Sequence, residues 1–182
     1  MLNTTLCYVT RGNDVLMLHR VKKKNDINQD KWIGIGGKFL ENESPEECLL
    51  REAKEETGLT LTSWQCRGVV TFLNDCCEGE YMYLFTADGF EGRMKECDEG
   101  DLQWISRDFL NRLPKWEGDQ IFLDLLWQNA PFFLRPCATA GINWLKPYWT
   151  EKRSGESKYK KEAHGPPFVV SKMGILRYVK TP

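Results

Sequence analysis

One segment of the chain, residues 44–58, carries the signals that begin and end a helix. Ser44 and Glu47 have the spacing of a capping box, in which two side chains satisfy the free N–H groups of the first turn. Pro45 falls at the first helical position, where its missing N–H removes no hydrogen bond. Gly58 stands where a residue with left-handed backbone ends a helix. The sequence therefore predicts a helix over 44–58.

This predicted helix gathers carboxylates beside its apolar stripe. On a helical wheel at about 100° per residue, Glu55 and Glu56 lie within about 60° of Glu52. Leu49 and Ala53 occupy the adjoining sector, so the acidic sector borders the predicted core. Like charges one turn apart destabilise a helix by a few tenths of a kcal/mol. A hard divalent cation such as Mg²⁺ removes this repulsion, because it prefers carboxylates, water and phosphate oxygens as ligands.

An exposed acidic face is the alternative interpretation, since glutamate is a good helix former and charged faces are usually solvated. A glycine turn, Gly34–Gly37, precedes the helix and follows a short strand-like run. Such a turn can bring backbone carbonyls close to an ion held by the helix carboxylates. The turn, the capped helix and the clustered carboxylates together favour a metal site.

Strand-like and helix-like runs surround this segment. Residues 4–10 and 14–20 predict a hairpin around Gly12 and Asn13. A short strand that starts at Trp32 runs into the glycine turn, further strands are predicted at 66–74, 80–87 and 101–105, and helices at about 106–112 and 118–129. Glycine, proline and lysine punctuate the later chain, which predicts a poorly ordered stretch at 150–166.

The composition narrows the class of protein. At 182 residues and 41% hydrophobic, the chain can bury one core, and its net charge of −1 provides no field that would attract nucleic acid polymers or anionic membranes. No apolar run reaches the length of a membrane span, and the first residues lack the layout of a secretory signal. A cytoplasmic protein is expected. The seven cysteines show no paired spacing, which predicts reduced thiols and neither a zinc site nor a disulfide framework.

The segment from residue 37 to residue 59 matches a known signature in register. The pattern is G, five residues, E, seven residues, then R-E-apolar-x-E-E-x-G-apolar. The chain supplies Gly37, Glu43, Arg51, Glu52, Ala53, Glu55, Glu56, Gly58 and Leu59. This is the Nudix box. Residues 1–136 resemble the MutT-type branch of the Nudix hydrolases, particularly the MutX-like oxidised-purine nucleotide diphosphatases, in DKWIGIGGK before the box and PKWEGDQ after it.

The resemblance implies an α/β fold, the Nudix-type α/β/α sandwich around a mixed central sheet. We expect it to occupy residues 1–137. Residues 138–182 do not resemble the close relatives, and we expect a C-terminal extension that packs on the domain or is partly disordered.

The resemblance also implies a Mg²⁺-dependent attack of water on a phosphorus atom, in which Mn²⁺ can replace Mg²⁺. Carried over by position, Glu52, Glu55 and Glu56 would hold the metal, and Glu52 is our choice for the group that activates the water. Gly36 would offer its carbonyl to the metal, and Arg51 would orient the carboxylates. Glu43 would pair with Arg51 or support the metal from behind its ligands, and Gly37 would lie beside those ligands. Glu99 could add a carboxylate from outside the helix, with an exposed acidic loop as the alternative.

Substrate contacts are predicted outside the box. Lys38 is a candidate for the phosphates, and so is Lys23, for which a solvated basic loop is the alternative. The base would stack on an aromatic face and meet carboxyl groups, for which the candidates are Trp116, Glu117 and Asp119, with Phe72 as an opposite wall or as a strand core residue. Gly118 stands where a mammalian relative has an acidic residue, and Ile33 where some relatives have an Asn that contacts the base.

These features predict a nucleoside triphosphate pyrophosphohydrolase that converts 8-oxo-dGTP into 8-oxo-dGMP and pyrophosphate. Hydrolysis of ADP-ribose or of a dinucleoside polyphosphate is the alternative, the latter because Tyr81 and Tyr83 lie near the position of a marker tyrosine. A sensor that binds nucleotides without turnover is a third hypothesis, although the chain keeps every charged residue of the box. The substrate is the expected partner, and both a monomer and a homodimer remain open.

Overall fold

The computed structural model describes residues 1–24, 26–73, 78–130, 133–138, 169–170 and 176–177. The chain divides into two compact units, Met1–Pro147 and Tyr148–Pro182. In the second unit, strands β8 (Val169–Val170) and β9 (Leu176–Arg177) pair antiparallel. The stretch predicted to be poorly ordered, 150–166, lies outside the described residues. The division into a domain at 1–137 and an extension at 138–182 stays a prediction.

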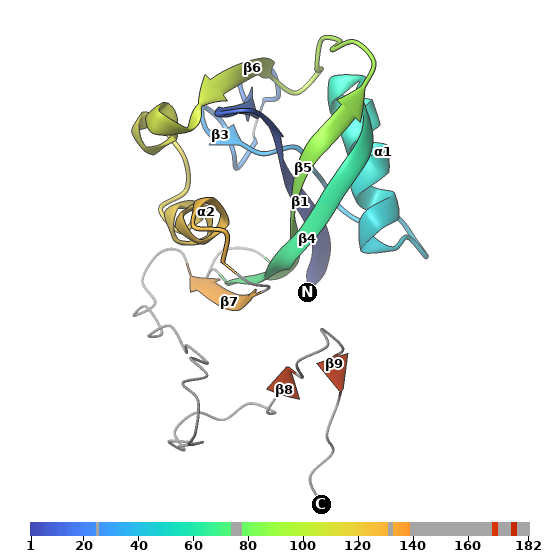
Figure 1. The fold of residues 1–182 in the computed structure, drawn as a ribbon, viewed down its shortest axis with the longest axis vertical. Helices are drawn as coiled ribbons and strands as arrows, with labels where there is room; N and C mark the ends of the chain where they lie inside the picture. Colours follow the sequence, from blue (N-terminus) through green and yellow to red (C-terminus); the bar gives the residue numbers. More distant parts are fainter. Residues whose placement is uncertain (25, 74–77, 131–132, 139–168, 171–175, 178–182) are drawn as a thin grey trace, which may run out of the picture. The chain divides into compact units, whose positions relative to one another are not determined.

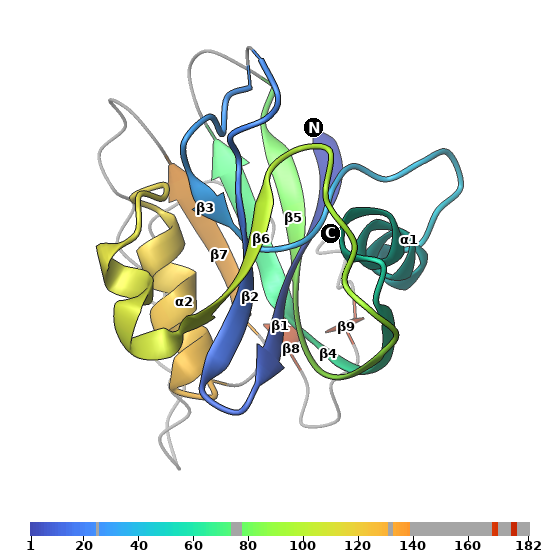
Figure 2. The ribbon, with the colours of Figure 1, turned by 90° about the horizontal axis from the view of Figure 1, so that it is seen from above.

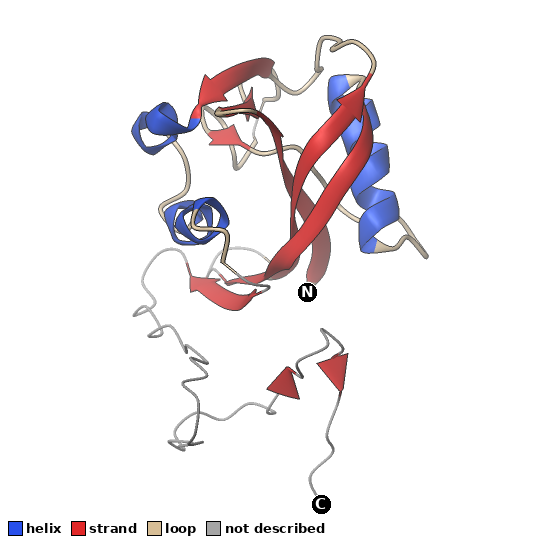
Figure 3. Ribbon diagram, viewed as in Figure 1, coloured by secondary structure: helices blue, strands red, loops and turns tan. Residues whose placement is uncertain are grey.

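The first unit is built on one mixed sheet (Figures 1 and 3). Its strands are β1 (Leu2–Arg11), β2 (Asp14–His19), β3 (Trp32–Ile33), β4 (Thr60–Leu73), β5 (Glu80–Glu91), β6 (Asp101–Ser106) and β7 (Phe133–Ala138). The strands lie in the order β3-β2-β1-β5-β4-β7, and β6 also pairs with β2 but is not part of this linear order. β1 runs parallel to β5 and β4 parallel to β7, while the other pairs are antiparallel. The predicted mixed sheet is confirmed.

Helices cover both faces of this sheet, as Figure 2 shows. On one face, Leu49 and Ala53 of α1 (Pro45–Thr57) join a buried cluster with residues of β1 such as Cys7. On the other face, α2 (Asp119–Trp127) contributes Phe122 to a second cluster that contains Tyr8 of β1. Neighbouring residues of β1 thus serve opposite clusters, as the alternation of a strand requires. The predicted α/β/α sandwich is confirmed.

The ends of α1 lie where the sequence predicts them. The Ser44 side chain accepts a hydrogen bond from the Glu47 backbone N–H, and the Glu47 carboxylate accepts one from the Ser44 N–H. Pro45 opens the helix, and Gly58 closes it with a φ of 78°. The local signals are sufficient because each of them acts within one turn of chain.

The hairpin around Gly12 is also confirmed, since Arg11 pairs with Asp14. Other boundaries differ. β4 begins at Thr60, ahead of the predicted 66, because its first residues already pair with the end of β5. The segment from Arg107 to Arg112 is a 3₁₀-helix (η1), and α2 is shorter than the predicted 118–129. No strand was predicted at Phe133–Ala138, where β7 lies.

The cysteines of the described chain fit the prediction of reduced thiols. Four of them have side chains that the structure describes, and all four are free: Cys7, Cys48, Cys66 and Cys97. Among the described helices, none is both long enough and apolar enough to cross a membrane.

Candidate active site

The glycine turn lies against the first strand and against α1. Isolated bridges join Ile35 to Cys7 and Lys38 to Thr4, so residues 35–38 run antiparallel to β1. The Gly36 N–H donates a hydrogen bond of 2.9 Å to Oε2 of Glu56. This contact brings the turn to the acidic side of the helix, as the sequence predicts.

Two glycines of the turn are needed for different reasons. Gly36 has a φ of 155°, and a Cβ built on it would lie 2.1 Å from the carbonyl oxygen of Thr5. A Cβ on Gly37 would lie 2.4 Å from Oε1 of Glu52. The first glycine lets the turn approach β1, and the second leaves room for a carboxylate of the box.

Arg51 holds the carboxylates of the box in place. Its Nε and Nη2 donate hydrogen bonds of 2.7 and 2.9 Å to the two oxygens of Glu43, a bidentate pair. Its Nη1 donates to Glu52 at 2.7 Å and to Glu55 at 3.1 Å. The guanidinium lowers the pKa of Glu43 to about 2. Arg51 lies one turn before Glu55 on the same side of the helix, so its side chain can reach the carboxylates of both Glu55 and Glu52.

Glu56 is the most buried of the helix carboxyls, at 7% exposure. Burial raises its pKa to about 8, the Gly36 N–H opposes this, and the charges of Glu52 and Glu99 add to it. Burial also raises the pKa of Glu52, whereas the Glu55 side chain is 60% exposed. A buried carboxyl among other carboxyls is an environment that a cation would relieve.

Glu99 lies within electrostatic range of the helix carboxyls, because its charge raises the pKa of both Glu52 and Glu56. It is paired with Arg20, which lies just after β2, and with Lys23 Nζ at 3.1 Å. The loop residue is therefore not a freely solvated acid. Glu52, Glu55, Glu56 and Glu99 together form an acidic cluster. Lys23, a candidate for phosphate contact, lies at its border through the contact with Glu99.

The donor set fits a magnesium ion in its chemistry. It consists of carboxylate oxygens, which are hard ligands, on a helix that the glycine turn meets at Glu56. Among the described residues, no three His, Cys, Asp or Glu side chains are gathered closely enough to hold a metal. Arg51 donates hydrogen bonds to oxygens of Glu52 and Glu55, and Arg20 donates one to Glu99. A bound cation would have to share these carboxylates with the two arginines.

A second group of candidate residues surrounds Trp116. Its indole Nε1–H donates a hydrogen bond of 2.7 Å to Asn28 Oδ1, and Lys31 Nζ lies 4.4 Å from the ring centroid. Asp119, in the first turn of α2, is 7% exposed. Burial raises its pKa to about 7, partly opposed by Lys115 and by a hydrogen bond from the backbone of Trp116. Glu117 is exposed.

Lys38 connects this group to the sheet. Burial raises the pKa of Glu80, and the charge of Lys38 opposes this shift. The charge of Glu80 in turn raises the pKa of Asp119. Thr4, bridged to Lys38, has a buried hydroxyl with no partner among the described residues. Sequence reasoning missed Thr4 and Glu80, since both lie in ordinary strand runs. Phe72 pairs with Glu80 through the backbone, and its side chain lies outside the description.

The raised pKa of Asp119 gives a prediction for stability. Its folded pKa, about 7, exceeds the usual value of 3.8, so the folded protein holds a proton that the unfolded chain has released. This contribution to the free energy of unfolding is complete below about pH 4 and is lost as the pH rises through about 7. Urea unfolding of the metal-free protein at pH 5 and pH 7.5 should therefore show a smaller loss in Asp119→Asn than in the wild type. Equal losses of the free energy of unfolding in the two proteins would contradict this prediction.

A mixed sheet between two helices, with the box carboxylates on one helix beside a glycine turn, is the arrangement of Nudix hydrolases. The sequence model of the family described as NUDIX domain matches residues 2–126. The chain therefore belongs to the Nudix family and is a hydrolase that acts on phosphorus anhydrides.

Particular relatives agree with this assignment. The chain is 32% identical over 130 residues to the Nudix hydrolase YvcI of Bacillus subtilis, covering 69% of this chain and 78% of the relative. It is 34% identical over 130 residues to the oxidized purine nucleoside triphosphate hydrolase of Danio rerio, covering 70% and 81%. The crystal structure of the MutT protein from Bacillus halodurans superposes with a TM-score of 0.67 at 26% identity, covering 76% of this chain and 90% of that one.

Proposed function

We propose that this Nudix hydrolase sanitises the nucleotide pool by converting 8-oxo-dGTP, or a closely similar oxidised purine nucleotide, into the monophosphate and pyrophosphate. The observation that carries the proposal is the buried carboxyl of Asp119 beside Trp116. With a pKa of about 7, it can donate or accept a hydrogen bond near neutral pH, as the edge of a modified purine requires. The similarity to the Danio rerio enzyme supports this choice of substrate class.

The acidic cluster supplies the chemistry. Glu52, Glu55, Glu56, Glu99 and the Gly36 carbonyl would hold Mg²⁺, or Mn²⁺ in its place. The ion supplies Lewis-acid stabilisation of phosphate charge and lowers the pKa of water. Glu52 accepts the proton of the attacking water, whose oxygen bonds to phosphorus as the phosphoanhydride bond breaks. A hydrogen bond of 2.7 Å from Arg51 Nη1 holds the Glu52 carboxylate in place.

The neighbouring cations orient the substrate. Lys38 is exposed beside the turn and Lys23 lies beside Glu99, so both can contact the phosphates. Trp116 offers an aromatic ring for contact with a base, and Lys31 Nζ lies 4.4 Å from its centroid. The proposal implies a small nucleotide partner in the cytoplasm, with no nucleic acid polymer or membrane.

The proposed substrate is tested by pyrophosphate release with Mg²⁺ on 8-oxo-dGTP and dGTP, and by phosphate-ester products from ADP-ribose and diadenosine tetraphosphate. We expect preference for 8-oxo-dGTP. Trp116→Ala should lower kcat/KM for it by about 10–100-fold, the value of one lost stacking contact. Asp119→Asn should reduce the ratio of kcat/KM between 8-oxo-dGTP and dGTP.

Asp124→Asn is the matched control, because it makes the same chemical change as Asp119→Asn at an exposed position of α2. It should leave the substrate ratio unchanged. Preference for ADP-ribose or for the dinucleotide would keep the hydrolase and reject the oxidised-purine substrate. Nucleotide binding without turnover of any of the four would favour the sensor.

A further inference from the structure

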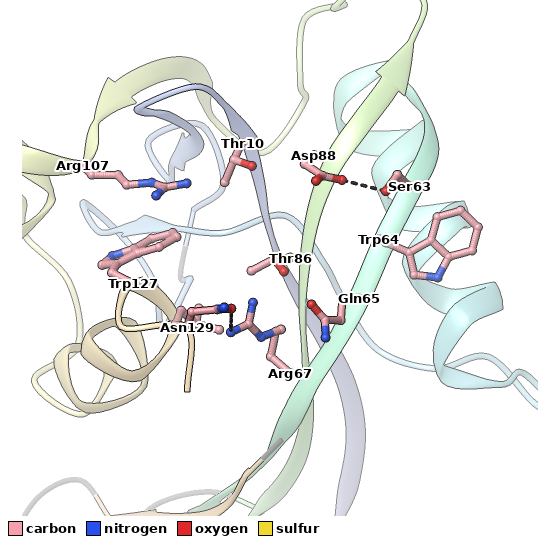
Figure 4. A pocket seen from close by; sticks show the side chains of 11 residues that line it. Thr10, Ser63, Trp64, Gln65, Arg67, Thr86, Asp88, Arg107, Trp127 and Asn129 are labelled. Atoms are coloured by element: carbon pink, nitrogen blue, oxygen red, sulfur yellow. Dashed lines mark hydrogen bonds between the residues drawn. The ribbon is translucent and has the colours of Figure 1, made fainter. Parts of the chain in front are cut away.

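A cavity of about 400 Å³ lies on the face of the sheet that α2 covers. Strands β1, β4 and β5 provide one wall, through residues such as Thr10 and Thr86. Arg107 of η1 and Trp127 at the end of α2 provide another (Figure 4). Asp119 stands at the opposite end of α2.

This cavity is separate from the candidate active site. Thr4, bridged to the candidate phosphate ligand Lys38, and Thr10, in the cavity, lie on the same face of β1 because they are an even number of positions apart along the strand. At about 3.3 Å per residue, the two threonines are roughly 20 Å apart. Buried side chains of the second cluster, Tyr8 among them, lie between them along the strand.

Two guanidiniums in the cavity lack an acidic partner in the described chain. Arg67 is 7% exposed, and its Nη2 donates to Asn129 Oδ1 at 3.0 Å and to the Ala130 carbonyl at 3.2 Å, both neutral acceptors. The Arg107 guanidinium lies 4.5 Å from the ring centroid of Trp127. Its Nε is buried and has no hydrogen-bond partner within the described residues. The charge of neither guanidinium is neutralised within the described residues, so the cavity has capacity for an anion.

The wall formed by β4 and β5 determines which chemical group can be attached to the bound anion. The Asp88 carboxylate accepts a hydrogen bond of 2.7 Å from Ser63, and Figure 4 shows this pair across the cavity from Arg107. Gln65 and Thr86 also line the cavity. Asp88 would repel a second anionic group but can accept hydrogen bonds from sugar hydroxyls. The volume is larger than a single phosphate needs and falls within the usual range of small-molecule sites.

We propose that this cavity binds a pentose phosphomonoester, with its phosphate on Arg107 and Arg67 and its sugar hydroxyls toward Asp88. Planar guanidiniums are suited to phosphate oxygens, which supports this orientation. A free sugar phosphate and a nucleoside monophosphate share this chemistry. The proposal goes beyond the proposed function and does not depend on it, because none of the cavity residues belongs to the acidic cluster.

The indole N–H signal of Trp127 tests the site directly, and that of Trp116 reports on the proposed base site. We would titrate the ¹⁵N-labelled full chain with ribose 5-phosphate, guanosine monophosphate and inorganic phosphate, with signals assigned through Trp127→Phe and Trp116→Phe. Both esters should shift the Trp127 signal saturably and more tightly than inorganic phosphate does. Equal affinity for both esters points to a sugar phosphate, whereas tenfold tighter guanosine monophosphate points to the nucleotide.

Arg107→Met should weaken ester binding at Trp127 by about tenfold or more. The methionine keeps an apolar side chain over the ring of Trp127. Hydrolase turnover should be unchanged in this variant, and that result would show that it folds. Arg93→Met, the same change at an exposed position, should leave the affinity unaltered. An absent Trp127 shift, unchanged affinity in Arg107→Met, or equal affinity for inorganic phosphate and both esters would each overturn the proposal. These outcomes are independent of which triphosphate the enzyme hydrolyses.

Discussion

Replacing Glu52 by Gln is expected to lower kcat by about 10²–10⁴-fold, the usual contribution of a general base. The amide has nearly the same shape but cannot take a proton from water, and it loses the charge that faces Arg51 at 2.7 Å. Initial rates of pyrophosphate release from 8-oxo-dGTP at saturating Mg²⁺ measure this effect. We expect KM to change much less than kcat, because the substitution removes an interaction of the transition state.

A second readout concerns the metal. A ligand that binds only the folded state raises the melting temperature, so Mg²⁺ should stabilise the wild type more than it stabilises Glu52→Gln. Glu46→Gln makes the same chemical change on an exposed turn of the same helix and should behave like the wild type. Turnover of Glu52→Gln at the wild-type rate would remove Glu52 from the mechanism.

Alanine at the two glycines of the turn should separate stability from activity. Gly36→Ala places a methyl group 2.1 Å from the Thr5 carbonyl oxygen, which is backbone and cannot turn aside. We expect a loss of about 3 kcal/mol or more in the free energy of unfolding. In Gly37→Ala the methyl group meets the carboxylate of Glu52, the end of a flexible side chain. That variant should fold, and its kcat should fall by about 10²-fold because the carboxylate is displaced.

Urea unfolding and turnover, measured on both variants, distinguish the two effects. Gly12→Ala is the control for backbone strain alone, since Gly12 has a φ of 61° and no atom lies within 4 Å of its built Cβ. It should cost about 1 kcal/mol and leave activity intact. If Gly37→Ala lost as much stability as Gly36→Ala, the carboxylate would not be the group displaced.

The elements that the sequence predicted well are those specified by neighbouring residues. Ser44, Glu47 and Gly58 act within a turn of α1, so their spacing was sufficient to place both ends. β7 shows the opposite case. It pairs in parallel with β4, from Gly68 with Phe133 onward, and no local pattern encodes a partner so distant in sequence. The same holds for β4, whose early residues are extended by pairing with the end of β5.

The candidate site divides in the same way. The box residues lie on one helix and one turn, so periodicity could group Glu52, Glu55 and Glu56. Thr4 and Glu80 come from strands that only the register of β1 on β5 brings together, and strand alternation does not give that register. The Lys31 ammonium over Trp116 depends on a loop packing against another loop. Such contacts have no signature in either segment alone.

The parallel pairing of β1 with β5 also has a consequence for synthesis of the chain. Leu2 pairs with Glu80, so one edge of the first strand stays open until the residues of β5 have left the ribosome. At about 5–20 residues per second this wait lasts roughly 4–16 s, during which a strand with an unpaired edge can associate with other chains. We therefore expect the soluble yield of this protein to depend on how fast residues 80–91 arrive and dock, a property that equilibrium unfolding of the purified protein does not report.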